Sequence, residues 1–233
     1  MLRFSGAKYF FIIALFMTYL YKLVKIASTD TMIITTASFK GGVAKTTTAI
    51  HLAAYLQTKG QTLLIDGDNN RSATRWAERS VERGGLPFKV VGVNQSARYS
   101  KGCEHFVIDT EASAEEAELR EIVDGCDLLI LPTTPDTMSL DALIQTVELL
   151  EALSIDKYRV LLTRVPPPPR REGEEAREFL MEAGFPLFKG RIREAVAFQK
   201  AANEGVLVHQ ISDRRARTAW NEYCEIGKEV FGE

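Results

Sequence analysis

The stretch SFKGGVAKTT, residues 38–47, places two lysines and two threonines around a pair of glycines. The phosphates of a nucleotide are bound by inward-pointing backbone N–H groups at a helix N-terminus, by one lysine, and by a hydroxyl that helps to hold Mg²⁺. Lys45 can supply the lysine and Thr46 the hydroxyl. Gly41 and Gly42 allow the tight turn that aims the N–H groups. The stretch therefore predicts a phosphate-binding loop.

Two features set this loop apart from the ordinary motif. The common P-loop pattern, G-x-x-x-x-G-K-[ST], has glycines at the two positions that Phe39 and Ala44 occupy here. A second lysine, Lys40, lies five residues before Lys45 and has no role in that pattern. Taken alone, the stretch could also be a glycine turn with a threonine cap, so the choice depends on the rest of the chain.

Three carboxylates follow apolar runs further along the chain. The segment LLIDGDNN ends one strand candidate with Asp66 and Asp68, and FVIDT ends another with Asp109. A carboxylate at the end of a buried strand is costly unless it faces a cation or a water network, and a magnesium nucleotide would supply the cation. The alternative is that these acids cap the helices that follow them. We favour the metal and water role for the three acids together.

The elements that would position these side chains alternate along the chain from Met32 onward. Strands are expected at 32–38, 61–66, 88–93, 105–110, 127–133 and 158–164, with a seventh candidate at 186–192. Helices are expected near 45–59, 70–83, 114–124, 137–152, 172–184, 193–203 and 213–231. This alternation predicts an α/β fold of three layers, a mostly parallel sheet with helices on both faces. Such folds bind ligands at the carboxyl ends of their strands, where the loop and the three acids fall.

The composition excludes several classes of protein. Lys and Arg total 29 against 31 acidic residues, a formal net charge of −2, so binding to nucleic acid would need a local patch of cations. Three cysteines without C-x-x-C spacing disfavour a disulfide framework and a closed zinc site. A reducing cytoplasm fits this cysteine usage best.

The first 31 residues differ from the rest of the chain. Residues 9–21, YFFIIALFMTYLY, form an apolar run between basic residues. This run is shorter than the roughly 20 residues that span a bilayer, although the apolar residues after it bring the length closer. We expect residues 1–31 to be a mis-assigned upstream extension, with residues 32–233 as the functional domain. A membrane anchor is the second interpretation, and a signal peptide is disfavoured.

Several motifs together resemble one family. KGGVAKTTTA resembles the deviant Walker A loop of the ParA/MinD group of P-loop ATPases, whose pattern K-G-G-x-x-K-[ST] tolerates Phe39 and Ala44. LLIDGDNNRSAT resembles the group's D-x-D-P-Q-x-x-A-T switch segment, with Asn69 in place of proline. Further segments that resemble the group are VIDT, LLILPTTPDTMSLDAL and RIREAVAFQKAANEGVLVHQ. The resemblance covers residues 32–225 and implies the P-loop NTPase fold.

The resemblance also implies roles for individual residues. The chain would be a slow ATPase with ATP and Mg²⁺ as cofactors, and it would close into a homodimer when ATP binds. Lys45 would contact the β and γ phosphates, Lys40 would reach the phosphates of the second subunit, and Asp68 would position the attacking water. The metal set would be Thr46, Asp66 and Asp109, with Asp66 supporting the loop. The nucleotide-binding set would be Lys40, Gly41, Gly42, Val43, Ala44, Lys45, Thr46 and Thr47.

Basic residues near the C-terminus are the candidates for nonspecific DNA binding, which the resemblance implies. Clusters of cations are usually solvated faces, but phosphate contacts without sequence preference need little more than such clusters. The resemblance further implies a ParB-like or adaptor protein that stimulates hydrolysis, a cytoplasmic and nucleoid-associated location, and a plasmid, chromosome or protein assembly as cargo. The DNA-binding candidates are Lys189, Arg191, Arg193, Arg214, Arg215 and Arg217.

Three alternatives come from other classes of protein. A membrane-anchored signalling kinase of the bacterial tyrosine kinase type would use the apolar N-terminus, but the tail WNEYCEIGKEVFGE holds Tyr223 rather than a tyrosine cluster. A redox ATPase like the nitrogenase iron protein needs paired cysteines at a dimer seam, and Cys103 and Cys126 are poor candidates. A MinD-like membrane helix should be basic, whereas the last turn is acidic.

Overall fold

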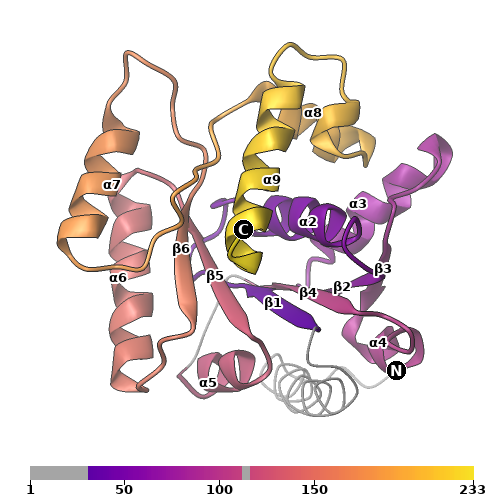
Figure 1. Cartoon of the computed structure of the whole chain (residues 1–233), viewed down its shortest axis with the longest axis horizontal. Helices are drawn as coiled ribbons and strands as arrows, with labels where there is room; N and C mark the ends of the chain where they lie inside the picture. Colours follow the sequence, from indigo (N-terminus) through magenta and orange to yellow (C-terminus); the bar gives the residue numbers. More distant parts are fainter. Residues whose placement is uncertain (1–30, 112–115) are drawn as a thin grey trace.

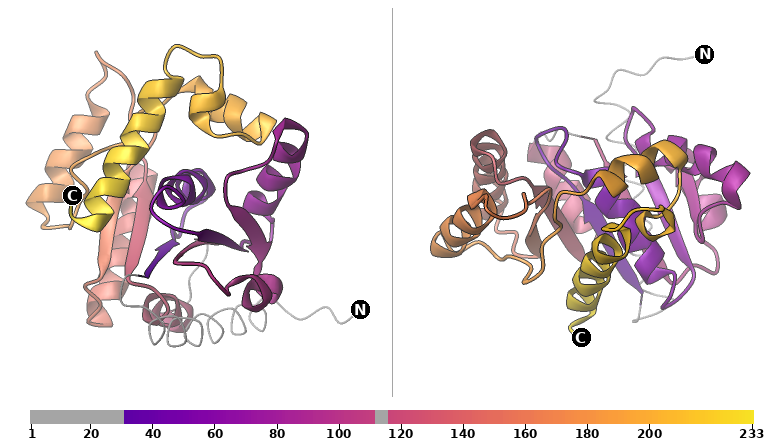
Figure 2. Two further views of the ribbon diagram at one scale, coloured as in Figure 1. Left: turned by 45° about the vertical axis from the view of Figure 1, so that its right-hand side comes forward. Right: turned by 90° about the horizontal axis from the view of Figure 1, so that it is seen from above.

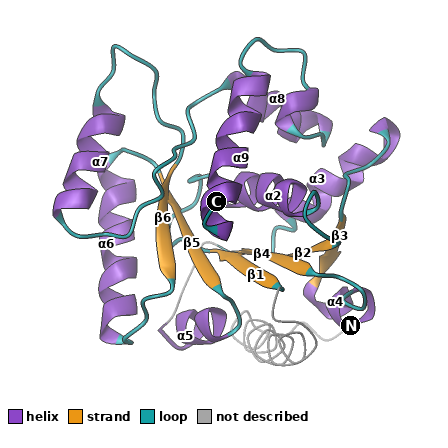
Figure 3. Ribbon diagram, in the orientation of Figure 1, coloured by secondary structure: helices purple, strands orange, loops and turns teal. Residues whose placement is uncertain are grey.

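The structure, a computed structural model, describes residues 31–111 and 116–233. Within these residues one sheet runs through the molecule, and each pair of neighbouring strands is parallel (Figures 1 and 3). The strand order is β3-β2-β4-β1-β5-β6, so the strand that precedes the glycine-rich loop lies inside the sheet. The strands are β1 (Met32–Thr36), β2 (Thr62–Gly67), β3 (Lys89–Gly92), β4 (His105–Thr110), β5 (Leu128–Thr133) and β6 (Tyr158–Leu162).

Helices cover both faces of the sheet, as the alternating pattern predicts (Figure 2). One face carries α2 (Lys45–Leu56), α3 (Ser72–Ser80), α8 (Val196–Glu204) and α9 (Ala216–Phe231). The other face carries α4 (Val93–Tyr99), α5 (Glu116–Asp124), α6 (Thr137–Ala152) and α7 (Glu172–Glu182). Two short 3-10 turns, η1 (Val81–Arg83) and η2 (Val208–Gln210), follow α3 and α8. The three-layer α/β prediction is therefore confirmed.

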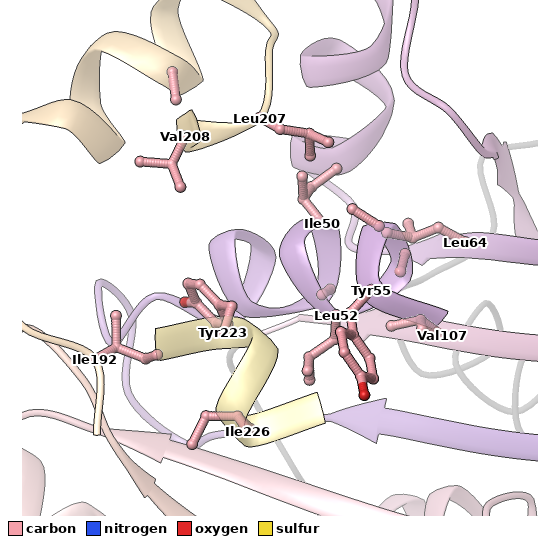
Figure 4. Close-up of a cluster of buried hydrophobic side chains, with 14 of the residues drawn as sticks. Ile50, Leu52, Tyr55, Leu64, Val107, Ile192, Leu207, Val208, Tyr223 and Ile226 are labelled. Carbon is pink, nitrogen blue, oxygen red and sulfur yellow. The ribbon is translucent and has the colours of Figure 1, made fainter. Parts of the chain in front are cut away.

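Alternation along the buried strands builds two cores. Ile33 of β1 packs into the core beneath α4 to α7, whereas its neighbour Ile34 packs into the core beneath α2, α3, α8 and α9. Both side chains are fully buried, because a central parallel strand has helices on each face. Figure 4 shows part of the second core, where Leu52 and Tyr55 of α2 lie near Ile226 of α9. The phosphate-loop helix is thus packed directly against the C-terminal helix.

Several elements differ from the expectations by more than a residue or two at their ends. The predicted strand at 186–192 is wrong, because the segment forms only an isolated bridge between Leu187 and Val160 of the edge strand β6. The predicted helices near 193 and 213 begin later, at Val196 and Ala216. Helix α4 was not predicted, since VNQSARY has too few apolar residues to show a helical period.

The predicted extension at residues 1–31 lies outside the described residues except for Thr31, and it stays a prediction. Across residues 31–111 and 116–233, none of the helices has both the length and the apolar character that a membrane crossing needs.

Candidate nucleotide-binding site

The glycine-rich loop connects β1 to α2 at the carboxyl edge of the sheet. Gly42 has a φ of 82°, which glycine adopts without strain. Ala44 has φ 69° and ψ 30° as the N-cap of α2, and this left-handed conformation is unfavourable for alanine. Helix α2 begins at Lys45, the next residue, so its free N–H groups face the space inside the loop. The loop thus combines a glycine turn with a helix N-terminus, and phosphate binding by it stays a prediction.

Lys45 is held at the centre of this loop. Its Nζ donates to the carbonyl oxygen of Lys40 at 3.3 Å. Burial lowers the pKa of Lys45, while the charges of Asp109 and Asp68 act in the opposite direction. The lysine and the two acids are therefore close enough to interact electrostatically, although they come from different parts of the sheet.

Lys40 points instead toward the N-terminus of α6. Its Nζ lies 2.8 Å from Oδ1 of Asp136 and 2.8 Å from Oγ of Ser139. Asp136 is also the N-cap of α6, because its carboxylate accepts from the Ser139 amide at 3.1 Å. Burial acts to raise the pKa of Asp136, but hydrogen bonds from Lys40, Thr134 and Ser139 hold it below its usual range. Within this chain the second lysine is thus bound to a helix cap.

Asp109 is the most deeply buried acid of the site. Its strand β4 lies between β1 and β2, and the registers place it beside Thr36 and Asp66. The Thr36 hydroxyl donates to Oδ1 at 3.3 Å, whereas Oδ2 is buried without a hydrogen-bond partner among the described residues. Burial raises the pKa of Asp109 to about 7. A buried carboxylate oxygen without a partner is costly unless a cation or water approaches it.

Asp66 and Asp68 support the segment that leads into α3. Asp66 accepts from the backbone N–H and the hydroxyl of Thr74, at 2.7 and 2.6 Å, and from the Asp68 amide at 3.1 Å. Asp68 accepts from the Asn70 amide and the Ser72 hydroxyl, both at 2.8 Å. The carboxylate of Asp66 is therefore largely occupied by the loop, and that of Asp68 faces the cleft described next.

A cleft of about 560 Å³ lies beside Lys45 and Asp68. Its phosphate-loop end is lined by Gly41, Gly42, Ala44, Lys45, Thr46 and Thr47, and Asp68 lies beside it. Its far end is lined by residues of α8, the segment before it, and α9. These are the apolar or aromatic Ile192, Ala195, Phe198, Ala202 and Tyr223, together with Arg193, Glu194 and Gln199. The volume is in the range of small-molecule sites, and the two ends suit a polyphosphate and a ring system.

The fit for Mg²⁺ can be judged from the donors around the loop. The described residues contain no cluster of three or more His, Cys, Asp or Glu side chains that could cage a metal ion. A nucleotide-bound Mg²⁺ needs few protein ligands, because phosphate oxygens and water fill most of its octahedron. The free Oδ2 of Asp109 and the hydroxyl of Thr46, which lines the cleft, fit such an ion.

The DNA-binding candidates separate into two groups. Arg191 and Arg193 are paired with carboxylates, at 3.4 Å to Glu174 and with Glu222 respectively. Arg193 also lines the nucleotide cleft. The amide of Lys189 donates to Glu229 at 2.8 Å. Exposed side chains at the start of α9 make up the second group, Arg214, Arg215 and Arg217.

Four residues of the site were missed in the sequence. Asp136 and Ser139 hold Lys40, and the pattern P-D-T-M-S gives a helix cap as their only signal. Thr163 and Arg164, at the end of β6, donate to the phosphate loop, at 3.0 Å to the Val43 carbonyl and 3.2 Å to the Gly42 carbonyl. No motif in the chain points to the second pair.

The parallel sheet, the loop between β1 and α2, and the acids at the ends of β2 and β4 define a P-loop nucleotide-binding protein. Residues 34–208 match the CobQ/CobB/MinD/ParA nucleotide binding domain family, and the chain belongs to this family.

Three comparisons illustrate the relationship. The chain is 39% identical over 194 residues to the maintenance of carboxysome distribution protein A of Gloeobacter kilaueensis, covering 82% of this chain and 90% of the relative. Cyanothece McdA, solved as an ATP complex, has a similar fold, with a TM-score of 0.68 at 18% identity over 87% of this chain and 97% of the other. MinD of Pyrococcus horikoshii, solved with Mg-ADP, gives a TM-score of 0.63 at 18% identity, over 86% and 96%.

Proposed function

We propose that this chain is an ATPase that binds Mg-ATP, closes into a homodimer around it, binds DNA without sequence preference and positions a cargo. The observation that carries the proposal is the cleft lined by the phosphate loop, Lys45 and Asp68, with the buried, partnerless oxygen of Asp109 close enough to Lys45 to interact with its charge. Such a combination of donors serves phosphoryl transfer, in which positioning and charge stabilisation supply most of the catalysis.

The loop residues would bind the nucleotide, as the geometry of the cleft supports. The N-terminus of α2 and Lys45 would hold the phosphates, and Thr46 with Asp109 would hold Mg²⁺. A bound Mg²⁺ would supply charge neutralisation for the phosphates at this position. Asp68 would orient the attacking water, because its carboxylate lies beside the phosphate end of the cleft. Asp66 would keep the segment from Asp68 to Thr74 in place.

Lys40 would act between two subunits. Lys45 already occupies the loop of its own chain, whereas Lys40 reaches away from it to Asp136. A second chain facing this edge would offer its phosphates to Lys40, and the lysine would leave its present partners. ATP would therefore control dimer formation, and a ParB-like or adaptor protein would stimulate the slow hydrolysis.

The DNA-binding surface and the cargo are the most specific parts of the proposal. Arg214, Arg215 and Arg217 are exposed at the start of α9, which suits phosphate contacts to DNA and a cytoplasmic, nucleoid-associated location. The Gloeobacter relative is named for carboxysome distribution, so we favour a protein assembly as cargo over a plasmid or chromosome. The same relationship favours positioning over the membrane-anchored kinase.

The test is calorimetry of the full chain with Mg-ATP, combined with light scattering in AMPPNP and in ADP. We expect binding, and a doubling of mass in AMPPNP alone. Lys45→Ala is the matched control and should abolish both responses, because the loop loses its central cation. Absence of ATP binding by the wild-type protein at millimolar nucleotide would overturn the proposal.

A further inference from the structure

Asn69 and Glu111 join two segments that leave neighbouring strands at the carboxyl edge of the sheet. Gly67, the last residue of β2, is in register with Thr110, the last residue of β4. Just past these ends, the side-chain amide of Asn69 donates to Oε2 of Glu111 at 2.5 Å. A side-chain hydrogen bond therefore continues the connection between β2 and β4 beyond their backbone ladder.

Glu111 also belongs to the phosphate end of the nucleotide cleft, which it lines together with Lys45 and Asp68. Burial lowers the pKa of Lys45, and the charge of Glu111 acts in the opposite direction, as do those of Asp109 and Asp68. Asn69 does not line the cleft; it lines a separate cavity of about 400 Å³, which Asp68 also borders. Asn69 would therefore affect a bound nucleotide only through its neighbours.

The bonds that hold the Asp68 carboxylate come from its own segment. It accepts from the Asn70 amide and from the Ser72 hydroxyl, both at 2.8 Å. These bonds fix the carboxylate within the turn, but they do not fix the turn relative to β4, as the bond from Asn69 to Glu111 does. The D-x-D-P-Q pattern has proline at the position of Asn69, and a proline ring would restrict this backbone where asparagine does not.

We propose that Glu111 is a positioning residue for ATP hydrolysis. Through Asn69 it holds the turn that carries Asp68 in place beside β4, and β4 in turn lies next to β1, which leads into the phosphate loop. The inference rests on the proposed function, because it needs Mg-ATP in the cleft. Loss of the bond would act on the rate more than on the affinity, since a small displacement of a water-orienting group is costly for hydrolysis while the phosphates keep their contacts to the loop.

The test exchanges the donor and the acceptor of this bond in the full chain. Asn69→Asp places two carboxylates opposite each other, and Glu111→Gln places two amides opposite each other. The double variant restores one amide and one carboxylate in the reverse order, with nearly unchanged shape and the net charge of the wild type. Calorimetry measures the affinity for Mg-ATP, and phosphate release at saturating ATP measures the rate of hydrolysis.

A control separates the hydrogen bond from its charge. Glu78 is exposed on α3, pairs with Arg71 at 3.4 Å and does not line the cleft. Asn69→Asp combined with Glu78→Gln therefore has the net charge of the wild type but lacks the amide that donates to Glu111. Glu78→Gln alone should leave the affinity and the rate unchanged.

We expect Asn69→Asp to slow hydrolysis about tenfold, because the bond is lost and two carboxylates repel each other, and to change the ATP affinity less than about threefold. Glu111→Gln should slow hydrolysis only about threefold, since its amide oxygen still accepts from Asn69. The double exchange should return the rate to within about twofold of the wild type. Adding Glu78→Gln to Asn69→Asp should not restore it.

Three results in a hydrolysing wild-type protein would overturn the inference: an unchanged rate in Asn69→Asp, a double exchange as slow as Asn69→Asp, or recovery with Glu78→Gln, which would assign the effect to net charge. A loss of ATP affinity as large as the loss of rate would place Glu111 in binding rather than in positioning, and would also overturn it. Wild-type protein that neither binds nor hydrolyses Mg-ATP would overturn the proposed function, and this inference with it.

Discussion

His51, in the second turn of α2, should make the stability of the protein depend on pH between about 6.5 and 4. The ring is fully buried, and its pKa is lowered to about 4 by that burial. Nε2 accepts from the Val208 amide at 3.1 Å, so Nδ1 carries the proton and donates to the Thr47 carbonyl at 2.7 Å. The Tyr223 ring stacks on it with centroids 4.9 Å apart. A charged ring would carry a proton on Nε2 as well, so Nε2 could no longer accept from the Val208 amide.

The magnitude follows from the difference between the folded and unfolded pKa values. An unfolded histidine binds its proton below pH about 6.5, whereas His51 in the folded state does so only near 4. Between these values the unfolded state binds more protons, so the free energy of unfolding falls as the pH falls. The full effect is about 3 kcal/mol, and about 2 kcal/mol of it should be lost between pH 7.5 and pH 5.

The assay is urea unfolding of the wild type and of His51→Gln at these two pH values. Glutamine can donate to Thr47 and accept from Val208, but it does not titrate. The variant should be less stable at pH 7.5, because it loses ring packing, yet lose about 2 kcal/mol less than the wild type on going to pH 5. His209→Gln, at a more exposed ring, is the matched control and should change the pH dependence less. Equal losses in the wild type and His51→Gln would refute the reasoning.

Three further predictions concern the loop and the DNA surface. Lys45→Ala should abolish ATP binding, whereas Lys40→Ala should keep measurable affinity in calorimetry yet lose hydrolysis; equal losses of affinity would indicate an ordinary monomeric P-loop. Ala44→Gly should raise the free energy of unfolding, measured in urea, by up to about 1 kcal/mol, because the left-handed conformation favours glycine. A variant less stable than the wild type would contradict the strain at Ala44. Arg214→Ala with Arg215→Ala should weaken binding to every duplex alike and flatten the salt dependence, by about 0.9 in the log–log slope per lost phosphate contact. A gel-shift assay in the presence of ATP measures this binding. An unchanged slope would indicate that DNA binds at another surface.

The sheet could be predicted from the sequence because its strands are buried on both faces. Runs such as LLID and HFVID carry apolar residues at consecutive positions, which is the pattern of a parallel sheet between two helical layers. The segment at 186–192 carries a similar density of apolar residues, but Pro186 and Gly190 interrupt it, and it meets the sheet only at its edge. Composition alone does not distinguish a buried edge segment from a strand.

The phosphate side of the site could also be predicted, since it lies on short contiguous motifs. Lys45, Thr46 and Asp68 line the cleft, whereas Asp66 and Asp109 do not, and their roles in binding stay predictions. The partners of Lys40 could not be predicted, because Asp136 is 96 residues away and resembles any helix cap. Arg164 gave no signal either, since its conformation is imposed by the residues around it rather than by its own type.

The Lys40 contact bears on how dimer formation would be controlled. The pair is partly exposed, at 31% for Lys40 and 54% for Asp136, so it contributes about 1 kcal/mol or less to stability. Asp136 keeps its bond to the Ser139 amide when the lysine leaves, and α6 therefore loses no cap. Releasing Lys40 is thus a small cost beside the gain from a charge-assisted contact to a phosphate. In the proposed function, Lys40 would therefore be released at little cost, and nucleotide in the phosphate loop would decide whether a second chain binds.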